Sequence, residues 1–491
     1  MKHTDIIQKL NLEQKCALLS GETVFTTRAL PGKGIPAITL SDGPNGVRKQ
    51  AGAADHLGLN PSVPATCFPT SSATACSWDE KLGEAVGEAL GEEAAAQEVA
   101  VLLGPGLNIQ RSPLCGRDFE YFSEDPILAG RMAAAYVRGI QKNGISACPK
   151  HFAVNSQELR RMASDSVLDE RTLRELYLTG FEIVVKEAKP KTIMTSYNLI
   201  NGTYANENAH LLQDILRKDW GFDGAVVTDW GGSNDHALGV KNGSTLEMPC
   251  PGGDSIRELM KAVQDGKISE ADVDARLDEM LELVLSTHAA VEKAPRTFDA
   301  AAHHKLARRA AAESIVLLRN EGGILPLKPN EKLAVIGDFA ETPRYQGAGS
   351  SAVNALQVDT LLDCIKADDS GITLVGYASG FERQGAADAE KLEEAVALAK
   401  KADTVLLCLG LDELRESEGL DRSDMKLAEN QQRLLAAVAA VNPNVVVLLS
   451  AGAPVETPWV GQCRALVYGA LGGQAGAGAA ADVLTGKLCP C

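Results

Sequence analysis

The sequence predicts an α/β protein of two domains: a (β/α)8-type barrel followed by a doubly wound α/β sandwich domain. The chain has 491 residues, which is too long for one ordinary hydrophobic core. Short apolar runs alternate with amphipathic helical stretches, and a polar segment separates two such series. We therefore expect a barrel over residues 1–290, a linker over 291–310 and a sandwich over 311–491.

The first series alternates candidate strands with helical patterns. Parallel strands joined by helical crossovers are the arrangement that this order predicts, and six or more such units favour a closed barrel. The candidate strands are residues 37–40, 99–103, 145–148, 192–196, 225–228 and 245–248, and the candidate helices are residues 80–100, 126–143, 169–187 and 209–220.

The second series follows the polar stretch 289–304 and a candidate helix at 305–319. Its order favours an open, doubly wound sheet. The candidate strands are residues 333–337, 373–375, 404–409, 445–449 and 465–468, with helices at 387–400 and 428–441. The run from Gly476 to Ala481 fits a loose dinucleotide-binding fingerprint, but the chain ends ten residues later, so we interpret it as small-residue helix packing.

Composition narrows the class of function. The formal net charge of −17 argues against nucleic acid or an anionic membrane as a partner. The first residues lack the apolar region of a signal peptide, and no apolar run approaches the ~18 residues of a membrane span. The eleven cysteines are an odd number, several of them in apolar surroundings, which favours a reducing cytoplasm. The pair Cys489 and Cys491 is too little for a zinc site.

Polar residues follow the candidate strands of the first series directly. In a (β/α)8 barrel the carboxyl ends of the strands share one face, which carries the active site, so we expect these side chains to converge. They are Asp42 after 37–40, Lys150 and His151 after 145–148, Tyr197 after 192–196, and Asp229 with Trp230 after 225–228.

Asp229 ends a buried apolar run and is followed by Trp230. A short carboxylate at a strand end is rigidly held, and an indole offers an apolar face to a sugar ring. Retaining glycosidases use two carboxyl groups ~5–5.5 Å apart, one as nucleophile and one as acid/base. The alternative interpretation of Asp229 is a cap for the following helix.

The second carboxyl group is less evident. Glu418 lies on a charged loop after the candidate strand 404–409, and Gly419 beside it would let the backbone approach a ligand. The alternative is a solvated surface loop. Arg117 stands among carboxylates in the segment 108–126, where its guanidinium can hold sugar hydroxyls. Lys150 and His151 offer further donors, although a single Lys or His is more often structural.

Metal and nucleotide motifs are missing. The sequence contains no His-Glu-x-x-His, no phosphate-binding Gly-x-x-x-x-Gly-Lys and no Gly-x-Ser-x-Gly. Its eight histidines are scattered, so we expect no metal site.

Together these motifs resemble glycoside hydrolase family 3, in the order expected over essentially the whole chain. Each motif alone is weak, and eight in order are specific. They are Gly34-Ile35-Pro36, Ser41-Asp42-Gly43-Pro44, the segment 108–126, Lys150-His151-Phe152, Met194 to Asn198, Val227 to Trp230, and, in the second domain, Tyr345 to Ser351 with Ser417 to Arg422.

The resemblance implies a retaining, exo-acting β-glycosidase, most closely a β-glucosidase, acting on a small glycoside or oligosaccharide without metal or organic cofactor. It implies Asp229 as nucleophile and Glu418 as acid/base, supplied across the domain interface. It also implies a sugar pocket lined by Asp42, Arg117, Lys150, His151, Met194, Tyr197, Trp230 and Ser350.

The end of the chain departs from the family. The family continues past residue 487, usually into a fibronectin-type domain, whereas this chain stops at Cys491, so we expect a C-terminal truncation. A catalytically impaired sugar-binding remnant, a β-xylosidase and, more remotely, a nucleotide-dependent oxidoreductase stay open as alternatives, as does a homo-oligomer.

Overall fold

The computed structural model describes residues 1–52 and 60–490, so Cys491 of the C-terminal cysteine pair lies outside it. The chain divides into two compact units. Unit 1 contains Met1–Ala65, Asp79–Arg111 and Tyr121–Asp299. Unit 2 contains Thr66–Trp78, Ser112–Glu120 and Ala300–Cys491. Two segments of the first half of the chain therefore belong to unit 2, which the sequence did not indicate.

Parallel strands form the centre of unit 1. One sheet has the order β1 (Leu40–Asp42), β2 (Val101–Leu103), β3 (Ser146–Ala147), and a second parallel pair joins β5 (Thr192–Met194) to β8 (Ala225–Val227). These strands confirm five of the predicted runs, although β1 begins at the last residue of the expected strand 37–40.

Single backbone bridges continue this series of strands. Parallel bridges join Phe152 to Thr195, Val227 to Leu246 and Ser20 to Glu247. Antiparallel bridges then join Gly21 to Thr27 and Thr26 to Thr39, which precedes β1. The expected strand 245–248 is present only as two of these bridges, in which Leu246 pairs with Val227 and Glu247 with Ser20.

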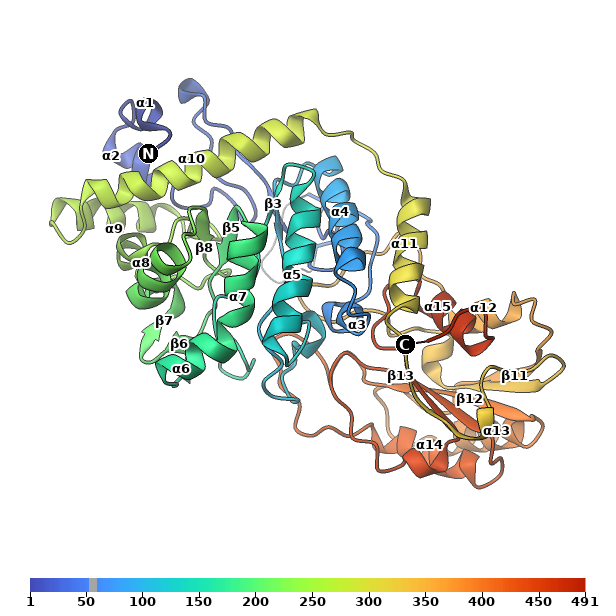
Figure 1. Cartoon of the computed structure of the whole chain (residues 1–491). Helices are drawn as coiled ribbons and strands as arrows, with labels where there is room; N and C mark the ends of the chain where they lie inside the picture. The colour runs from blue at the N-terminus through green and yellow to red at the C-terminus, as the bar shows by residue number, and fades with distance from the viewer. Residues whose placement is uncertain (53–59, 491) are drawn as a thin grey trace. The chain divides into compact units, whose positions relative to one another are not determined.

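Helices α4 (Glu80–Ala96) and α5 (Pro126–Gln141) lie side by side in unit 1 (Figure 1). Glycines let their backbones approach: a Cβ on Gly87 would lie 2.4 Å from the carbonyl oxygen of Tyr136. Asp125 caps α5 by accepting from the backbone N–H groups of Ile127 and Leu128. α5 also contacts β3, so this pair of helices supports the strands that carry the polar residues.

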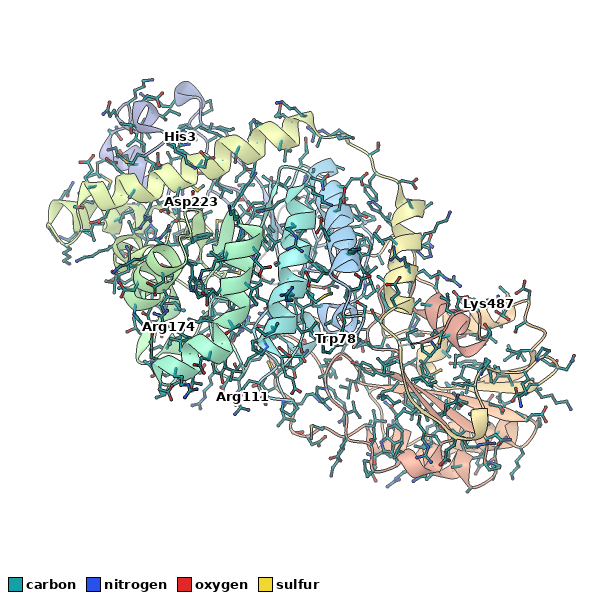
Figure 2. All side chains as sticks on the ribbon, viewed as in Figure 1. His3, Trp78, Arg111, Arg174, Asp223 and Lys487 are labelled. Carbon is teal, nitrogen blue, oxygen red and sulfur yellow. The ribbon has the colours of Figure 1, made fainter. Side chains whose placement is uncertain are left out.

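The other two expected helices of unit 1 contain π-helical turns, which the sequence analysis did not predict. Residues 169–187 form α6 (Glu170–Thr172) and α7 (Thr179–Ile183), with π-helical turns at Leu173–Tyr177 and Val184–Ala188. His210–Asp219 is also π-helical. Arg174, labelled in Figure 2, pairs with Asp219 at 3.0 Å and links two of these segments. The spacing of apolar residues predicts a helix, but it does not distinguish an α-helix from a π-helix.

Three further helices of unit 1 were not anticipated: α8 (His236–Asn242), α9 (Gly253–Gln264) and the long α10 (Glu270–Lys293). α10 begins with a capping box between Ser269 and Asp272. The linker was expected over residues 291–310. Because α10 ends at Lys293 and α11 begins at Ala300, only residues 294–299 of that stretch lie outside a helix. The smaller elements are α1 (Thr4–Ile7), α2 (Leu12–Ala17), β4 (Asp165–Ser166), β6 (Leu199–Ile200), β7 (Thr203–Tyr204) and the 3-10 turns Pro31–Lys33 and Ala205–Glu207.

Unit 2 contains a six-stranded sheet of order β11-β10-β12-β13-β14-β9. All neighbours are parallel except β14 and β9. The strands are β9 (Val316–Asn320), β10 (Lys332–Ile336), β11 (Thr373–Ala378), β12 (Thr404–Gly410), β13 (Val445–Ser450) and β14 (Ala465–Tyr468). The five predicted strands are confirmed, and the sheet is open and doubly wound with one antiparallel edge.

The helix expected at 305–319 is wrong in its second half. α11 (Ala300–Ala312) ends early, and Val316–Asn320 forms the edge strand β9. The sequence analysis merged a helical pattern with the short apolar run 315–318 that follows it. The remaining helices are α3 (Ser71–Ala75), α12 (Leu361–Lys366), α13 (Ala389–Ala399), α14 (Glu429–Ala439) and α15 (Gly476–Leu484), with 3-10 turns at Asp118–Glu120, Glu321–Gly323, Asp338–Ala340 and Val460–Gln462.

The glycine- and alanine-rich run from Gly476 forms α15, which packs against α11, as the helix-packing interpretation expected. Within residues 1–52 and 60–490, no helix is both long enough and apolar enough to cross a membrane.

Candidate functional site

Asp229 stands just beyond the end of β8 and is held rigidly there. The hydroxyl of Thr228 donates to the carbonyl of Met248 at 3.0 Å and accepts from its N–H at 2.8 Å, which fixes the backbone on one side. Oδ1 of Asp229 accepts from the N–H of Trp230 at 2.7 Å, and the residue is 8% exposed. The following helix, α8, is capped by Asp235 instead, so Asp229 is not its cap.

Two aromatic residues adjoin this carboxylate. Trp230 is half-buried; its ring N–H donates to the carbonyl of Val24 at 2.8 Å and its ring lies 5.3 Å from that of Phe25. The hydroxyl of Tyr197 donates to the Trp230 carbonyl at 2.9 Å. These contacts fix the indole beside Asp229, where an apolar ring face suits a sugar.

The other predicted residues of unit 1 also lie at or beyond strand ends. Lys150 and His151 follow β3 and are 2% and 1% exposed, and Nε2 of His151 lies 3.6 Å from Oδ2 of Asp229. Met194 ends β5, where its carbonyl accepts from the N–H of Phe152 at 2.7 Å. Asp42 ends β1, and its carbonyl accepts from the N–H of Arg48 at 2.9 Å.

Glu418 is held within unit 2 by two donors. Its Oε2 accepts from the N–H of Ser350 at 2.7 Å, and its Oε1 lies 3.5 Å from the Arg117 guanidinium. The Glu418 side chain is 15% exposed, so the loop is not simply a solvated surface. Gly349 has a φ of 114°, and a Cβ there would lie 2.4 Å from the Cβ of Glu418. Gly419 has a φ of 85° with nothing within 4 Å of such a Cβ, so it serves the loop conformation.

Arg117 is positioned by Glu120. Its Nε and a terminal nitrogen lie 2.8 and 2.7 Å from Oε2 of Glu120, and both side chains are 1% exposed. The 112–120 segment is tied to the Glu418 loop, because the N–H of Arg422 donates to the carbonyl of Leu114 at 2.8 Å. A buried, paired guanidinium keeps a fixed direction, which suits recognition of hydroxyl or carboxylate groups.

A buried carboxyl cluster underlies this loop, which the sequence did not single out. Glu416 is fully buried; it accepts from the N–H of Gly452 at 2.9 Å, and its carbonyl accepts from Arg344 at 3.0 Å. Burial raises the pKa of Glu416, opposed by Arg344 and Arg422. Burial, followed by the nearby charge of Glu416, raises the pKa of Asp118 to about 8.

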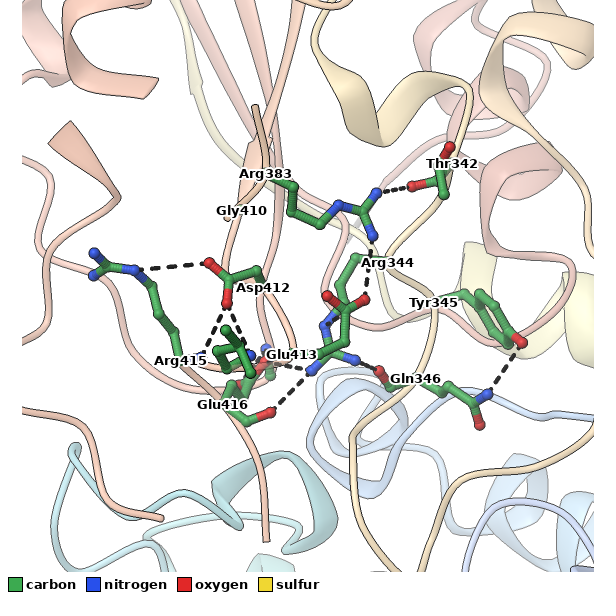
Figure 3. Close-up of polar contacts among 12 residues, drawn as sticks. Thr342, Arg344, Tyr345, Gln346, Arg383, Gly410, Asp412, Glu413, Arg415 and Glu416 are labelled. Atoms are coloured by element: carbon green, nitrogen blue, oxygen red, sulfur yellow. Dashed lines mark hydrogen bonds and ion pairs between the residues drawn. The ribbon is translucent and has the colours of Figure 1, made fainter. Parts of the chain in front are cut away.

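Arginines connect this cluster to the loop that follows β12. Figure 3 shows Arg344 between Glu413 and Glu416, at 3.9 and 3.8 Å from their carboxyl oxygens. Arg383 adds a contact of 3.2 Å to Glu413, and Asp412 accepts from the N–H of Arg415 at 3.1 Å. The segment leading to Glu418 is therefore held by charge pairs as well as by backbone hydrogen bonds.

The predicted residues thus form two groups, each within one unit. Direct contacts join Asp229 to His151 and Trp230, and Trp230 to Tyr197; Arg117 and Ser350 contact Glu418. In the described part of the chain no group of three or more His, Cys, Asp or Glu side chains is arranged to hold a metal ion.

Matches to known proteins agree with this geometry. Residues 49–283 match the glycosyl hydrolase family 3 N-terminal domain, and residues 315–491 match the glycosyl hydrolase family 3 C-terminal domain. The chain is 46% identical over 489 residues to thermostable beta-glucosidase B of Acetivibrio thermocellus, a match that covers 99% of this chain and 64% of that protein. It is 44% identical to an exo-alpha-(1->6)-L-arabinopyranosidase of Bifidobacterium longum, over 99% of this chain and 65% of that one.

The crystal structure of a Bifidobacterium adolescentis GH3 beta-glucosidase superposes with a TM-score of 0.92 at 43% identity. That superposition covers 98% of this chain and 69% of the other. The chain therefore spans about two thirds of the length of these relatives. The chain belongs to glycosyl hydrolase family 3.

Proposed function

We propose that the chain is a retaining, exo-acting β-glucosidase in which Asp229 is the nucleophile and Glu418 the acid/base. The observation that carries this proposal is the carboxylate of Asp229, 8% exposed and fixed at a strand end between His151 and Trp230. Two relatives named as beta-glucosidases, at 46% and 43% identity, support the sugar class.

The reaction proceeds by double displacement. An oxygen of Asp229 attacks the anomeric carbon while the bond to the leaving oxygen breaks and Glu418 gives that oxygen its proton. Glu418 then takes a proton from water, which attacks the same carbon and breaks the bond to Asp229. The mechanism requires the two carboxyl groups ~5–5.5 Å apart on the bound sugar.

Glu418 has to exchange partners during this cycle. The N–H of Ser350 and the Arg117 guanidinium both face its oxygens, and such donors favour the ionised carboxylate. As an acid, Glu418 must carry a proton, so one of these contacts has to weaken when sugar binds. Arg117 keeps its second partner, Glu120, and can turn a donor towards a sugar hydroxyl without losing its position.

The other predicted residues line the sugar pocket in this proposal. Lys150 donates to sugar hydroxyls, Asp42 accepts from them, His151 lines the pocket beside Asp229, and Met194, Tyr197 and Trp230 provide apolar contact. Their support is placement: each belongs to a strand end or to the turn after one.

We also propose that the strands of unit 1 form a (β/α)8-type barrel. The support is the series of pairings that runs from β1 through β2, β3, β5 and β8 and, by way of single bridges, leads back to the residue before β1. On this view residues 1–290, apart from Thr66–Trp78 and Ser112–Glu120, form the catalytic barrel, and residues 311–491 form the sandwich that supplies Glu418.

A reducing cytoplasm is the proposed location. The supporting observation is a set of buried thiols: burial raises the pKa of Cys16, Cys148 and Cys408 to about 12, so these cysteines behave as inert core residues.

A pentosidase is the second candidate, because a relative at 44% identity is named an exo-alpha-(1->6)-L-arabinopyranosidase. Aryl β-glucoside, β-xyloside and α-L-arabinopyranoside separate the two. We expect the highest kcat/KM on the glucoside, and loss of turnover in Asp229→Ala but not in the exposed control Glu393→Gln. Preference for the arabinoside would establish the second candidate, and binding of glucose without hydrolysis of any substrate would indicate an impaired remnant.

A further inference from the structure

Buried polar side chains form a chain of contacts behind Asp229, all within unit 1. Nε2 of His151 lies 3.6 Å from Asp229, and Nδ1 of His151 lies 3.2 Å from the hydroxyl of Tyr121. That hydroxyl lies 3.1 Å from Nδ2 of Asn155, which in turn lies 3.4 Å from Oε1 of Glu158. Each of the four residues behind Asp229 is at most 2% exposed.

The contacts continue back to Asp229 on the other side. Arg161 pairs with Glu158 at 2.7 Å, and its guanidinium lies 4.8 Å from the centre of the Tyr197 ring. Tyr197 donates to the carbonyl of Trp230, whose N–H donates to Asp229. The Arg161 guanidinium balances the charge of the buried Glu158 carboxylate.

The chemistry of these groups favours one direction for the hydrogen bonds. An amide nitrogen only donates, so Nδ2 of Asn155 gives one hydrogen to the Tyr121 oxygen and the other to Glu158. The reverse orientation of the amide would set its oxygen against the Glu158 carboxylate. Of the two neighbours of the Tyr121 hydroxyl in this chain of contacts, Asn155 donates, so Nδ1 of His151 is the one that can accept the Tyr121 hydrogen. An accepting Nδ1 belongs to a neutral imidazole whose proton sits on Nε2, the nitrogen that faces Asp229.

We propose that Tyr121, backed by Asn155 and Glu158, is a positioning residue that holds His151 as the neutral Nε2–H tautomer against Asp229. The proposal rests on the proposed role of Asp229 as nucleophile. A neutral imidazole leaves the carboxylate charge for the developing positive charge at the anomeric carbon. An imidazolium at 3.6 Å would instead stabilise the carboxylate in the ground state and slow its attack.

The test combines a spectroscopic signature with kinetics. Nitrogen-15 NMR at pH 7 reads the tautomer in the full chain, with the His151 signals assigned by their loss in His151→Gln. We expect a protonated Nε2 and an unprotonated Nδ1 in the wild type. Tyr121→Phe should mix or reverse the tautomers and lower kcat about tenfold, with a smaller change in KM. Tyr136→Phe, at another buried tyrosine of unit 1, is the matched control and should change neither.

Two results would overturn the proposal: a His151 of the wild type that is doubly protonated or protonated on Nδ1, and a folded Tyr121→Phe that keeps both tautomer and kcat. The wild-type spectrum decides even if Tyr121→Phe does not fold. Failure of the proposed function is a separate result, since it appears as wild-type turnover that survives Asp229→Ala.

Discussion

Replacing Asp118 by asparagine should remove a pH dependence of stability that this buried carboxyl group imposes on the protein. Asp118 is fully buried, and burial together with the charge of Glu416 raises its pKa from 3.8 to about 8. In the folded protein the group therefore holds its proton through neutral pH, whereas in the unfolded chain it ionises.

The magnitude follows from the two pKa values. Because the folded value is the higher, the stabilisation is complete below pH 3.8 and is lost as the pH rises to about 8. Each pH unit in this window corresponds to about 1.4 kcal/mol, so between pH 4 and pH 7 the group should lower the free energy of unfolding by roughly 4 kcal/mol. The asparagine side chain of the variant has no proton to lose, so this fall should disappear.

Urea unfolding monitored by fluorescence from pH 4.5 to 8 measures the effect as the difference between variant and wild type. We expect Asp118→Asn to gain stability relative to wild type steadily across this window. The exposed control Glu393→Gln should run parallel to wild type. A difference between Asp118→Asn and wild type that stays constant from pH 4.5 to 8 would refute the reasoning, because it would mean that Asp118 is ionised in the folded protein.

Four further substitutions test the loop that carries Glu418 and its partner Arg117. Gly349→Ala places a Cβ 2.4 Å from that of Glu418 at a φ of 114°, so kcat on an aryl β-glucoside should fall. Gly419→Ala adds strain at a φ of 85° without such a contact and should retain more activity. Equal losses in the two variants would contradict the role of the contact with Glu418. Glu418→Gln should spare formation of the glycosyl-enzyme from dinitrophenyl glucoside, whose leaving group needs no proton, and slow that from poorer leaving groups; a uniform loss would remove the acid role. Arg117→Lys should raise KM and lower kcat, because an ammonium cannot keep both Glu120 and Glu418 as partners, and steady-state kinetics unchanged from wild type would exclude this arrangement.

The parallel strands were the most predictable part of the fold. β12 and β13 read as short, β-branched apolar runs because both faces of their sheet are covered, and the sequence placed them to within two residues. The edge strand β9 was missed because edge positions mix apolar and exposed residues, which hides the alternation. The run at 245–248 has the composition of a strand, yet it pairs with its neighbouring segments only at single residues. Whether such a run forms a full strand depends on the segments beside it, which its composition does not reveal.

The candidate site residues that follow strands were predictable from the sequence. Those that are distinguished only by their burial in the folded chain were not. Asp229, His151 and Trp230 each come directly after a strand, so parallel topology brought them together. Glu416 and Asp118 look like ordinary loop charges in the sequence, and only their burial among arginines distinguishes them. Tyr121 likewise gains significance from its contact with His151, which lies 30 residues along the chain, and sequence spacing does not reveal such a contact.

The most direct test of the central claim is to trap the covalent intermediate. An activated 2-deoxy-2-fluoro-β-glucoside slows both steps of a retaining mechanism but slows release more, so the glycosyl-enzyme accumulates. Peptide mapping by mass spectrometry should then find one added sugar per chain, on the peptide that contains Asp229, and none in Asp229→Ala. A sugar attached to a different carboxylate, or steady turnover of the reagent with no labelled peptide, would contradict the assignment of Asp229 as nucleophile.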